Sequence, residues 1–391
     1  MRIAYLTDVY FPRVNGVSTS IDSFRDELIA AGHEVLLVAP EYGGERSAPG
    51  VVRVAARRVF VDPEDRMLRA RRVLDLEPQL RQSRPDLVHV QTPFVAHWAG
   101  ERLARRLGVP LVVSYHTYFE DYLHHYVPFA PRAALRALAR TASRRQCNQA
   151  QAVVVPSTAF RDVLLGYGVR APLVVLPTGV PLHAFAGGDG VAFRRRHGIA
   201  AQRPMMLHVG RMAHEKNVPF LLEVAAAVRR AVPDLLLVMA GEGPARPALE
   251  RRAAELGLGD AIRWLGYLPR DGELQSCYRA ADVFVFASRT ETQGLVLLEA
   301  MALGVPVVST AVLGTRDVLA ARQGALVAPE DVQAFADEVV RVLRDTSLRR
   351  ALGRAGAEQV RDCWSAPACA ERLVELYRGL TAAHLRGRAA A

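Results

Sequence analysis

Lysine is almost absent from this sequence. Of its 50 basic residues, only Lys216 is a lysine, and all the others are arginine. Such a bias reflects the base composition of a genome, so a surviving lysine indicates a position that arginine does not fill. The compact ammonium group and the planar guanidinium differ in how they contact an anion. We therefore consider Lys216 a candidate functional residue from the outset.

Cysteine is also scarce, and long hydrophobic runs are missing. No C-x-x-C pair occurs, which argues against a zinc or redox site and favours free thiols in a reducing compartment. No apolar run reaches the roughly 18 residues that a membrane-spanning helix needs. Asp8 interrupts the amino-terminal segment where a secretion signal would need its apolar core. We therefore expect a cytoplasmic protein. The cysteines are Cys147, Cys277, Cys363 and Cys369.

What the sequence does contain indicates a large globular protein with an anionic partner. Half of its 391 residues are hydrophobic and 23% are charged, a composition that excludes disordered and fibrous classes. The length suggests two or three domains. The net charge of +10 favours an anionic partner, and nucleic acid, an acidic membrane surface and phosphorylated substrates all qualify on charge alone.

Short apolar runs alternate with helical patterns along the whole chain, which predicts an α/β fold with parallel sheets. We predict one Rossmann-like domain over residues 1–185 and a second over 198–364, joined by a polar linker around Pro181 to His197. Ligands of such sheets bind beyond the carboxyl ends of the strands, so a cleft between the two domains is expected to be the binding site. The predicted strands are 3–7, 35–39, 87–91, 111–115, 152–156 and 174–177, then 205–209, 235–240, 262–265, 283–287 and 305–309.

Two motifs in the second half carry most of the chemistry. Arg211 and Lys216 lie five residues apart in a predicted strand-to-helix loop, where two cations beside a helix start suit a diphosphate. Glu291 and Glu299 lie eight residues apart, after the predicted strand 283–287, with Gly294 between them. The neighbours of Glu299 are those of a buried helix, and a buried carboxylate needs partners, so a ligand hydroxyl is an attractive one.

Weaker candidates lie elsewhere. Gly16, after the first predicted strand, permits close backbone approach to a ligand, although an ordinary turn explains it equally well. His116 ends another strand and faces the predicted cleft or packs as a core histidine. The stretch from Gly241 to Pro244 begins like a dinucleotide fingerprint, but Arg246 replaces the last glycine, so a nicotinamide enzyme is disfavoured.

A basic helix is predicted over residues 132–145. Its arginines repeat every fourth residue and form one stripe, whereas leucine and alanine lie on another side. Such a helix can lie on an anionic bilayer, or it can be a solvated helix packed on the core. The stripe comprises Arg132, Arg136, Arg140 and Arg144.

With these residues in view, the chain resembles the retaining glycosyltransferases of family 4, whose fold is the two-domain α/β arrangement called GT-B. The residues from Glu291 to Val308 match the family's E-x7-E motif and its continuation. The loop from Gly210 to Asn217 matches its Arg/Lys phosphate loop, and the segment from Asn15 to Ser18 matches its amino-terminal glycine loop. The resemblance covers nearly the whole chain, and it implies that a helix near 365–385 packs back on the first domain.

The resemblance implies a role for each matching residue. Arg211 and Lys216 would bind the donor diphosphate, with the backbone of Gly16 nearby, and His116 would contact the transferred sugar near the reacting carbon. Two cations on the diphosphate would make it a good leaving group. The family retains anomeric configuration without an essential metal or cofactor, so none is expected.

The remaining implied contacts lie in the second domain. Glu291 and the amides that follow it would hold the donor sugar, and Glu299 would hold the ribose hydroxyls. Residues around Tyr267 and Leu268 would edge the base. The amides of that sugar-binding loop belong to Gln293, Gly294 and Leu295.

The form of two segments, TETQG and HTYFEDYLHHY, is most similar to bacterial diacylglycerol glucosyltransferases. This similarity implies transfer of glucose from UDP-glucose to a lipid acceptor, by an enzyme that lies on the inner face of the cell membrane and binds no nucleic acid. A GDP-mannose-dependent mannosyltransferase acting on a phosphatidylinositol-type or soluble acceptor is the alternative. A non-catalytic membrane- or polyanion-binding protein is a more distant one.

Overall fold

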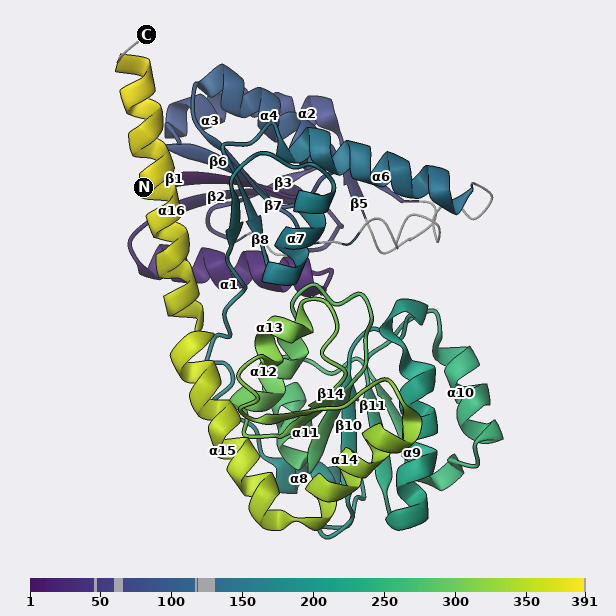
Figure 1. Cartoon of the computed structure of the whole chain (residues 1–391). Helices are drawn as coiled ribbons and strands as arrows, with labels where there is room; N and C mark the ends of the chain where they lie inside the picture. Colours follow the sequence, from purple (N-terminus) through teal and green to yellow (C-terminus); the bar gives the residue numbers. More distant parts are fainter. Residues whose placement is uncertain (46–47, 60–65, 117, 119–130, 390–391) are drawn as a thin grey trace. The chain divides into compact units, whose positions relative to one another are not determined.

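The computed structural model describes residues 1–45, 48–59, 66–116, 118 and 131–389, and Figure 1 shows its helices and strands. The chain forms two compact units. The first comprises Met1–Gly179 and Ala366–Ala391, and the second comprises Val180–Ser365.

The first unit contains a seven-stranded sheet whose strands all pair in parallel, in the order β3-β2-β1-β6-β7-β8-β9. Its central strands are fully buried and rich in Val and Leu, as expected for a sheet covered on both faces. A separate antiparallel pair, β4 and β5, lies beside it. The strands are β1 (Arg2–Leu6), β2 (Glu34–Pro40), β3 (Val51–Val54), β4 (Ala56–Arg58), β5 (Arg66–Leu68), β6 (Leu87–Val90), β7 (Leu111–Ser114), β8 (Ala152–Val155) and β9 (Leu173–Val175).

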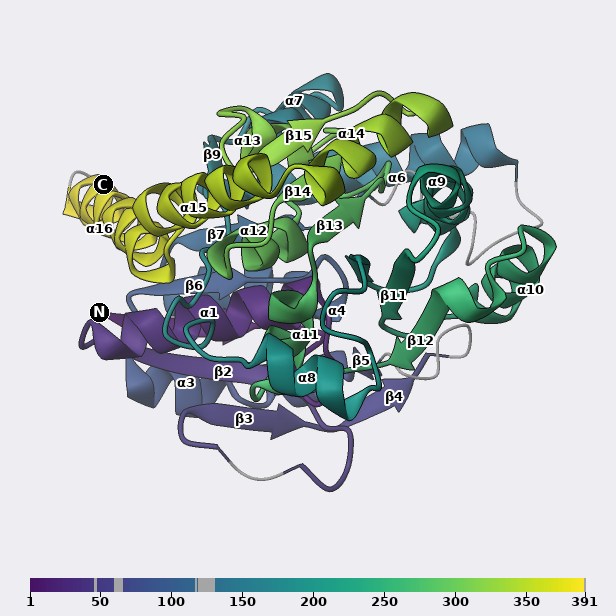
Figure 2. The same ribbon diagram turned by 90° about the horizontal axis from the view of Figure 1, so that it is seen from below.

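Helices cover both faces of this sheet. One core lies beneath α2, α3, α4, α6 and α7, and the other lies beneath α1 and the carboxy-terminal helix α16 (Figure 1 and Figure 2). The helix α16 thus returns to the first unit after the chain has built the second one. These helices are α1 (Gly16–Ala30), α2 (Ala70–Leu74), α3 (Glu77–Ser83), α4 (Val95–Leu107), α6 (Arg132–Cys147), α7 (Thr158–Gly166) and α16 (Ala366–Ala389).

The second unit contains a six-stranded parallel sheet in the order β12-β11-β10-β13-β14-β15. The order reverses at β10, because β11 and β12 are added on one side of it and β13 to β15 on the other. In open α/β sheets, ligands bind where the strand order reverses. The strands are β10 (Met205–Val209), β11 (Leu236–Ala240), β12 (Ile262–Gly266), β13 (Val283–Phe286), β14 (Val307–Ser309) and β15 (Ala325–Val327).

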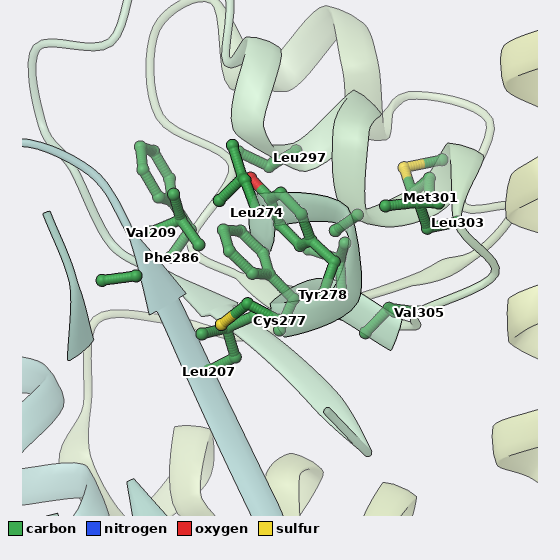
Figure 3. Packing of buried hydrophobic residues seen from close by; sticks show 14 of the residues in the cluster. Leu207, Val209, Leu274, Cys277, Tyr278, Phe286, Leu297, Met301, Leu303 and Val305 are labelled. Atoms are coloured by element: carbon green, nitrogen blue, oxygen red, sulfur yellow. The ribbon is translucent and has the colours of Figure 1, made fainter. Parts of the chain in front are cut away.

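Two hydrophobic cores hold the second unit together. Helices α8, α11, α12, α13 and α15 contribute to one, and α9, α10 and α14 to the other. Figure 3 shows part of the first core, where Tyr278 lies near Phe286 of β13 and Leu297 of α12. The helices are α8 (Gly190–Arg196), α9 (Val218–Ala231), α10 (Arg246–Glu255), α11 (Glu273–Ala280), α12 (Leu295–Ala302), α13 (Thr315–Leu319), α14 (Val332–Arg344) and α15 (Thr346–Cys363), and the short 3-10 turns are η1 (His214–Lys216) and η2 (Gly259–Ala261).

The prediction of two α/β domains with parallel sheets is confirmed, but four short strands were missed. These are β3, β4, β5 and β15, which have three or four residues each and carry too little hydrophobic periodicity to be recognised. The linker prediction is wrong for residues 190–196, which form α8. There Asp189 caps the helix, and Phe193 is fully buried in the core of the second unit.

Candidate active site

The sheet order brings two motifs together that lie far apart in the sequence. Strand β10 pairs with β13, and both run in the same direction, so their carboxyl ends lie side by side. The loop after β10 carries Arg211 and Lys216, and the loop after β13 carries Glu291. Both motifs therefore lie where the strand order reverses, the position at which ligands of such sheets bind.

Lys216 and Glu291 form an ion pair. The Lys216 Nζ donates to Glu291 Oε2 over 2.8 Å, and each side chain is about one-fifth exposed. Lys216 is the last residue of η1, and Asn217 then takes a left-handed conformation with φ of 55° before α9 begins. This turn directs the lysine from the β10 loop towards the β13 loop. The lone lysine of the chain thus lies at the candidate site.

The carboxyl group of Glu291 is held in its charged form. Burial alone would raise the pKa of Glu291, but Lys216 and the backbone N–H groups of Gln293 and Gly294 outweigh burial, so the pKa is lowered. The Gly294 amide donates to Glu291 Oε1 over 3.3 Å. An ionised carboxylate in this position can accept hydrogen bonds from the hydroxyl groups of a sugar.

Glu299 lies in α12 and is nearly fully buried, with partners of its own. Arg270 donates to Glu299 Oε1, and Tyr278 Oη donates to Oε2 over 3.0 Å. Burial therefore does not by itself require a ligand hydroxyl at Glu299, contrary to the argument from the sequence. Arg270 also stacks over Phe185, with its Cζ 5.5 Å from the ring centroid.

The sequence pattern did not indicate a role for Arg270. It follows β12 in the loop that also carries Tyr267 and Leu268. In a chain with 50 basic residues, one more loop arginine gives no signal. Its ion pair with Glu299 and its stacking over Phe185 distinguish it in the structure.

Glycine allows the loops of this site to approach one another closely. A Cβ atom on Gly241 would lie 2.0 Å from the carbonyl oxygen of Gly210, and one on Gly314 would lie 1.9 Å from that of Thr292. Backbone hydrogen bonds join the same loops, and the Gly314 N–H donates to the backbone carbonyl oxygen of Glu291 over 2.9 Å. The glycines after β11 thus serve loop packing, a reason unrelated to dinucleotide binding.

The other predicted donor contacts surround this pair. Arg211 is half-buried in the loop after β10, and Tyr267 is exposed after β12, whereas Leu268 packs against the hydrophobic core. Gln293 is buried beside Glu291, and Leu295 begins α12 after the left-handed Gly294, whose φ is 97°.

In the first unit, Asn15 and Gly16 form the start of α1. The Asn15 side chain accepts from the Ser18 N–H over 2.9 Å, and Ser18 Oγ accepts from the Asn15 N–H over 2.9 Å, which is a capping box. A Cβ atom on Gly16 would meet no atom of the described chain within 4 Å, so chain packing does not require glycine at this position.

His116 follows β7 and the buried Tyr115. Burial lowers the pKa of His116 to about 4, so the ring is neutral near pH 7. A neutral imidazole can donate one hydrogen bond to a sugar hydroxyl without adding positive charge. Most of the HTYFEDYLHHY segment that follows lies outside the described residues.

The arginine stripe lies on α6, and all four of its residues are exposed. Leu135, Ala139 and Ser143 form the buried side of the helix. None of the helices within the described ranges combines the length and apolarity needed to cross a membrane.

Comparison with known proteins identifies the family. The pattern described as "Glycosyl transferases group 1" matches residues 191–359, and the pattern described as "Glycosyltransferase Family 4" matches residues 14–184. An alpha-monoglucosyldiacylglycerol synthase of Streptococcus pneumoniae is 32% identical over 317 residues, which cover 79% of this chain and 71% of that protein. A GDP-mannose-dependent alpha-mannosyltransferase of Mycobacterium tuberculosis is 33% identical over 350 residues, or 84% of each chain.

Solved structures agree on the fold. Sucrose-phosphate synthase from Thermosynechococcus elongatus superposes with a TM-score of 0.78 at 22% identity, covering 98% of this chain and all of that one. Anabaena HepE in complex with UDP-glucose superposes with a TM-score of 0.75 at 17% identity, covering 97% of this chain and all of that one. The fold is therefore GT-B, and because two relatives above 30% identity each span more than two thirds of the chain, this chain belongs to the family 4 (group 1) glycosyltransferases.

Proposed function

We propose that this enzyme transfers glucose from UDP-glucose to a membrane lipid such as diacylglycerol, with retention of anomeric configuration. The observation that carries the catalytic part is the meeting of Lys216 and Glu291 where the strand order reverses. The choice of substrates is supported by the relatives named alpha-monoglucosyldiacylglycerol synthase in Streptococcus pneumoniae and Acholeplasma laidlawii.

The proposed reaction is driven by charge on the leaving group. As the bond between the anomeric carbon and the diphosphate breaks, negative charge grows on the diphosphate, and Lys216 and Arg211 stabilise it. A new bond forms between the anomeric carbon and the acceptor hydroxyl oxygen, and the proton of that hydroxyl group passes to the leaving phosphate oxygen. Preorganised cations of this kind act most strongly in a site shielded from water.

The remaining site residues hold the donor in this proposal. Glu291 accepts from the sugar hydroxyls, helped by the amides around Gln293, Gly294 and Leu295. Glu299 accepts from the ribose, and Tyr267 and Leu268 border the base.

In the first unit, the Gly16 amide contacts the donor and the neutral His116 contacts the transferred sugar.

A mannosyltransferase is the second candidate. Two GDP-mannose-dependent alpha-mannosyltransferases are 33% and 32% identical to this chain over 84% and 86% of its length. Nothing in the Lys216–Glu291 geometry distinguishes the two sugars, because it serves the diphosphate and a hydroxyl that both donors carry.

The partner surface is proposed to be an anionic membrane on the cytoplasmic side. The exposed arginine stripe of α6 supports this proposal, because basic residues near an anionic surface are attracted to it.

The test is a donor screen followed by turnover. UDP-glucose, UDP-galactose and GDP-mannose are first compared by thermal stabilisation of the purified enzyme, since a bound ligand raises the unfolding temperature. Release of nucleotide is then measured with diacylglycerol and with phosphatidylinositol in mixed micelles. Turnover with UDP-glucose and diacylglycerol supports the proposal, whereas turnover only with GDP-mannose replaces it by the second candidate.

A further inference from the structure

Arg270 is the accessible partner of a buried carboxylate in the second unit. Its Nη2 donates to Glu299 Oε1, and Tyr278 Oη donates to Oε2 over 3.0 Å. The arginine side chain is 28% exposed, whereas that of Glu299 is only 4% exposed. A ligand that reaches the carboxylate therefore also meets the guanidinium group of Arg270.

The guanidinium group is held in place by its neighbours. Its Cζ lies 5.5 Å from the centroid of the buried Phe185 ring, a cation–π arrangement. The buried side chain of Gln275 anchors the backbone, because its Nε2 donates to the Arg270 carbonyl oxygen over 3.0 Å and to that of Ala184 over 2.9 Å. Side chains that are already ordered lose less entropy when they bind a ligand.

The ion pair uses only part of the hydrogen-bonding capacity of Arg270. A guanidinium group carries several N–H donors in one plane. Within the described ranges of the chain, Glu299 Oε1 is the only acceptor that these donors meet. Neutralisation of the buried carboxylate therefore explains one donor of Arg270 and leaves the others available to a ligand.

We propose that Arg270 is a specificity-determining residue, which contacts a ribose hydroxyl group of the donor nucleotide together with Glu299. This inference rests on the proposed function, which assigns the ribose to Glu299. A hydroxyl group can donate to the carboxylate and accept from the guanidinium group at the same time, and each carboxylate oxygen can accept more than one hydrogen bond. A deoxy nucleotide would leave both protein groups without that partner, so the site should reject it.

The experiment measures, by titration calorimetry, how much more tightly a nucleotide binds than its deoxy analogues. UDP is compared with 2′-deoxy-UDP and 3′-deoxy-UDP, and GDP with the corresponding pair. The wild type is expected to bind the complete nucleotide at least about tenfold more tightly than one of its two analogues. In Arg270→Ala this affinity ratio is expected to fall to about threefold or less, the part that Glu299 retains.

Two further variants separate a direct contact from a structural role. Arg350→Ala removes the same charge from an exposed position of α15 in the same unit, so its affinity ratio should equal that of the wild type. Arg270→Lys keeps a positive charge beside Glu299 but lacks the planar fork of donors. If Arg270 only neutralised Glu299, the lysine would restore the ratio, whereas a direct contact leaves the ratio low. Partial unfolding of a variant weakens the binding of all the nucleotides equally and leaves the ratio unchanged.

The possible results either support or overturn the contact. Equal affinity of the wild type for a nucleotide and both analogues, an unchanged ratio in Arg270→Ala, or full restoration in Arg270→Lys would overturn it. Binding of GDP without UDP would replace the proposed donor, and the contact would then be judged on the GDP series, because both nucleotides carry the same ribose. Binding of neither nucleotide would contradict both the contact and the proposed function.

Discussion

At the scale of single residues, the Lys216–Glu291 ion pair raises the question of what the lysine does when a donor binds. The ammonium lies 2.8 Å from the carboxylate, and both side chains retain some exposure. A diphosphate with more negative charge can compete for the lysine, while Glu291 then accepts from sugar hydroxyls. The pair therefore holds both groups in place before the substrate arrives.

The first prediction concerns this lysine. Lys216→Ala should reduce turnover about a hundredfold, because loss of one charged contact to the leaving group costs about 3 kcal/mol in the transition state. Turnover is measured at saturating donor, with the far-ultraviolet circular dichroism spectrum as the folding control. Lys216→Arg tests whether charge alone suffices, and we expect it to recover only part of the rate. Wild-type turnover in Lys216→Ala would remove the lysine from the mechanism.

The second prediction separates the two glutamates. Glu299→Gln should weaken the binding of free UDP by about tenfold, because loss of one charged hydrogen bond costs about 1.5–3 kcal/mol. Glu291→Gln should leave UDP affinity within about twofold and lower turnover instead. Titration calorimetry with UDP measures the first effect and steady-state kinetics the second. Because Glu299 also partners Arg270, its variant should unfold at a lower temperature as well. Equal UDP affinities in the two variants would contradict the division of roles.

At the scale of elements, the loops of the second unit are packed so closely that several positions admit only glycine. Gly314 lies between β14 and α13, against the loop that carries Glu291. The site is therefore shaped by backbone packing as well as by charged side chains.

The third prediction tests this packing. Gly314→Ala should destabilise the second unit by about 1–3 kcal/mol or more and reduce donor binding, because its Cβ would lie 1.9 Å from the Thr292 oxygen. Denaturant unfolding with and without UDP measures both effects. Gly379→Ala in α16 is the control. A Cβ there meets nothing within 4 Å, so its stability should be unchanged or slightly raised.

The fourth prediction concerns the attachment of α16 to the first unit. His89 of β6 contacts Tyr377 of α16 through Nδ1 and Ser114 through Nε2, and Tyr377 also bonds to Tyr5 over 3.1 Å. Burial, with a smaller contribution from His116, lowers the pKa of His89 to about 3. Between about pH 3 and 6.5, His89 is therefore protonated in the unfolded chain and neutral in the folded chain.

The sign of the pH dependence follows from that difference. Because the pKa of His89 is lower in the folded chain, its contribution to stability is complete above about pH 6.5 and is lost as the pH falls towards 3. At pH 4.5 the free energy of unfolding should already have fallen by about 3 kcal/mol. Urea unfolding at a series of pH values measures the slope. Unfolding near pH 5 should take up at least one proton, measurable by calorimetry in buffers of different ionisation enthalpy. A flat stability between pH 5 and 7 would contradict it.

At the scale of the whole molecule, the excess of positive charge is placed unevenly. The net charge is +10, and replacement of the four stripe arginines by Gln would lower it to +6. The same change can be made elsewhere on the surface, which separates total charge from its location. Arg195, Arg350, Arg354 and Arg361 are exposed and lie in the second unit, so they provide the matched set.

The fifth prediction uses these two sets. The enzyme should float with anionic vesicles and detach as salt rises to about 0.5 M, because screening shortens the reach of exposed charges. Substitution of the stripe arginines by Gln should abolish flotation, whereas substitution of the second set should leave most of it. If both variants lose flotation equally, total charge rather than α6 attracts the membrane.

The sequence by itself determined the fold class and much of the site. Strand composition and the alternation with helices predict two parallel α/β units, because sheets buried on both faces require continuous apolar strands. The scarcity of lysine identified Lys216, and the E-x7-E spacing identified Glu291 and Glu299. These features are local, so they can be recognised without knowledge of which elements meet.

Only the tertiary structure decided how those residues pair. Lys216 contacts Glu291 because β10 and β13 are neighbours in the sheet. The order of the strands determines this adjacency, and the distance between the two residues in the sequence does not show it. The partners of Glu299 come from β12's loop and α11, so the inference of a ligand hydroxyl from burial failed.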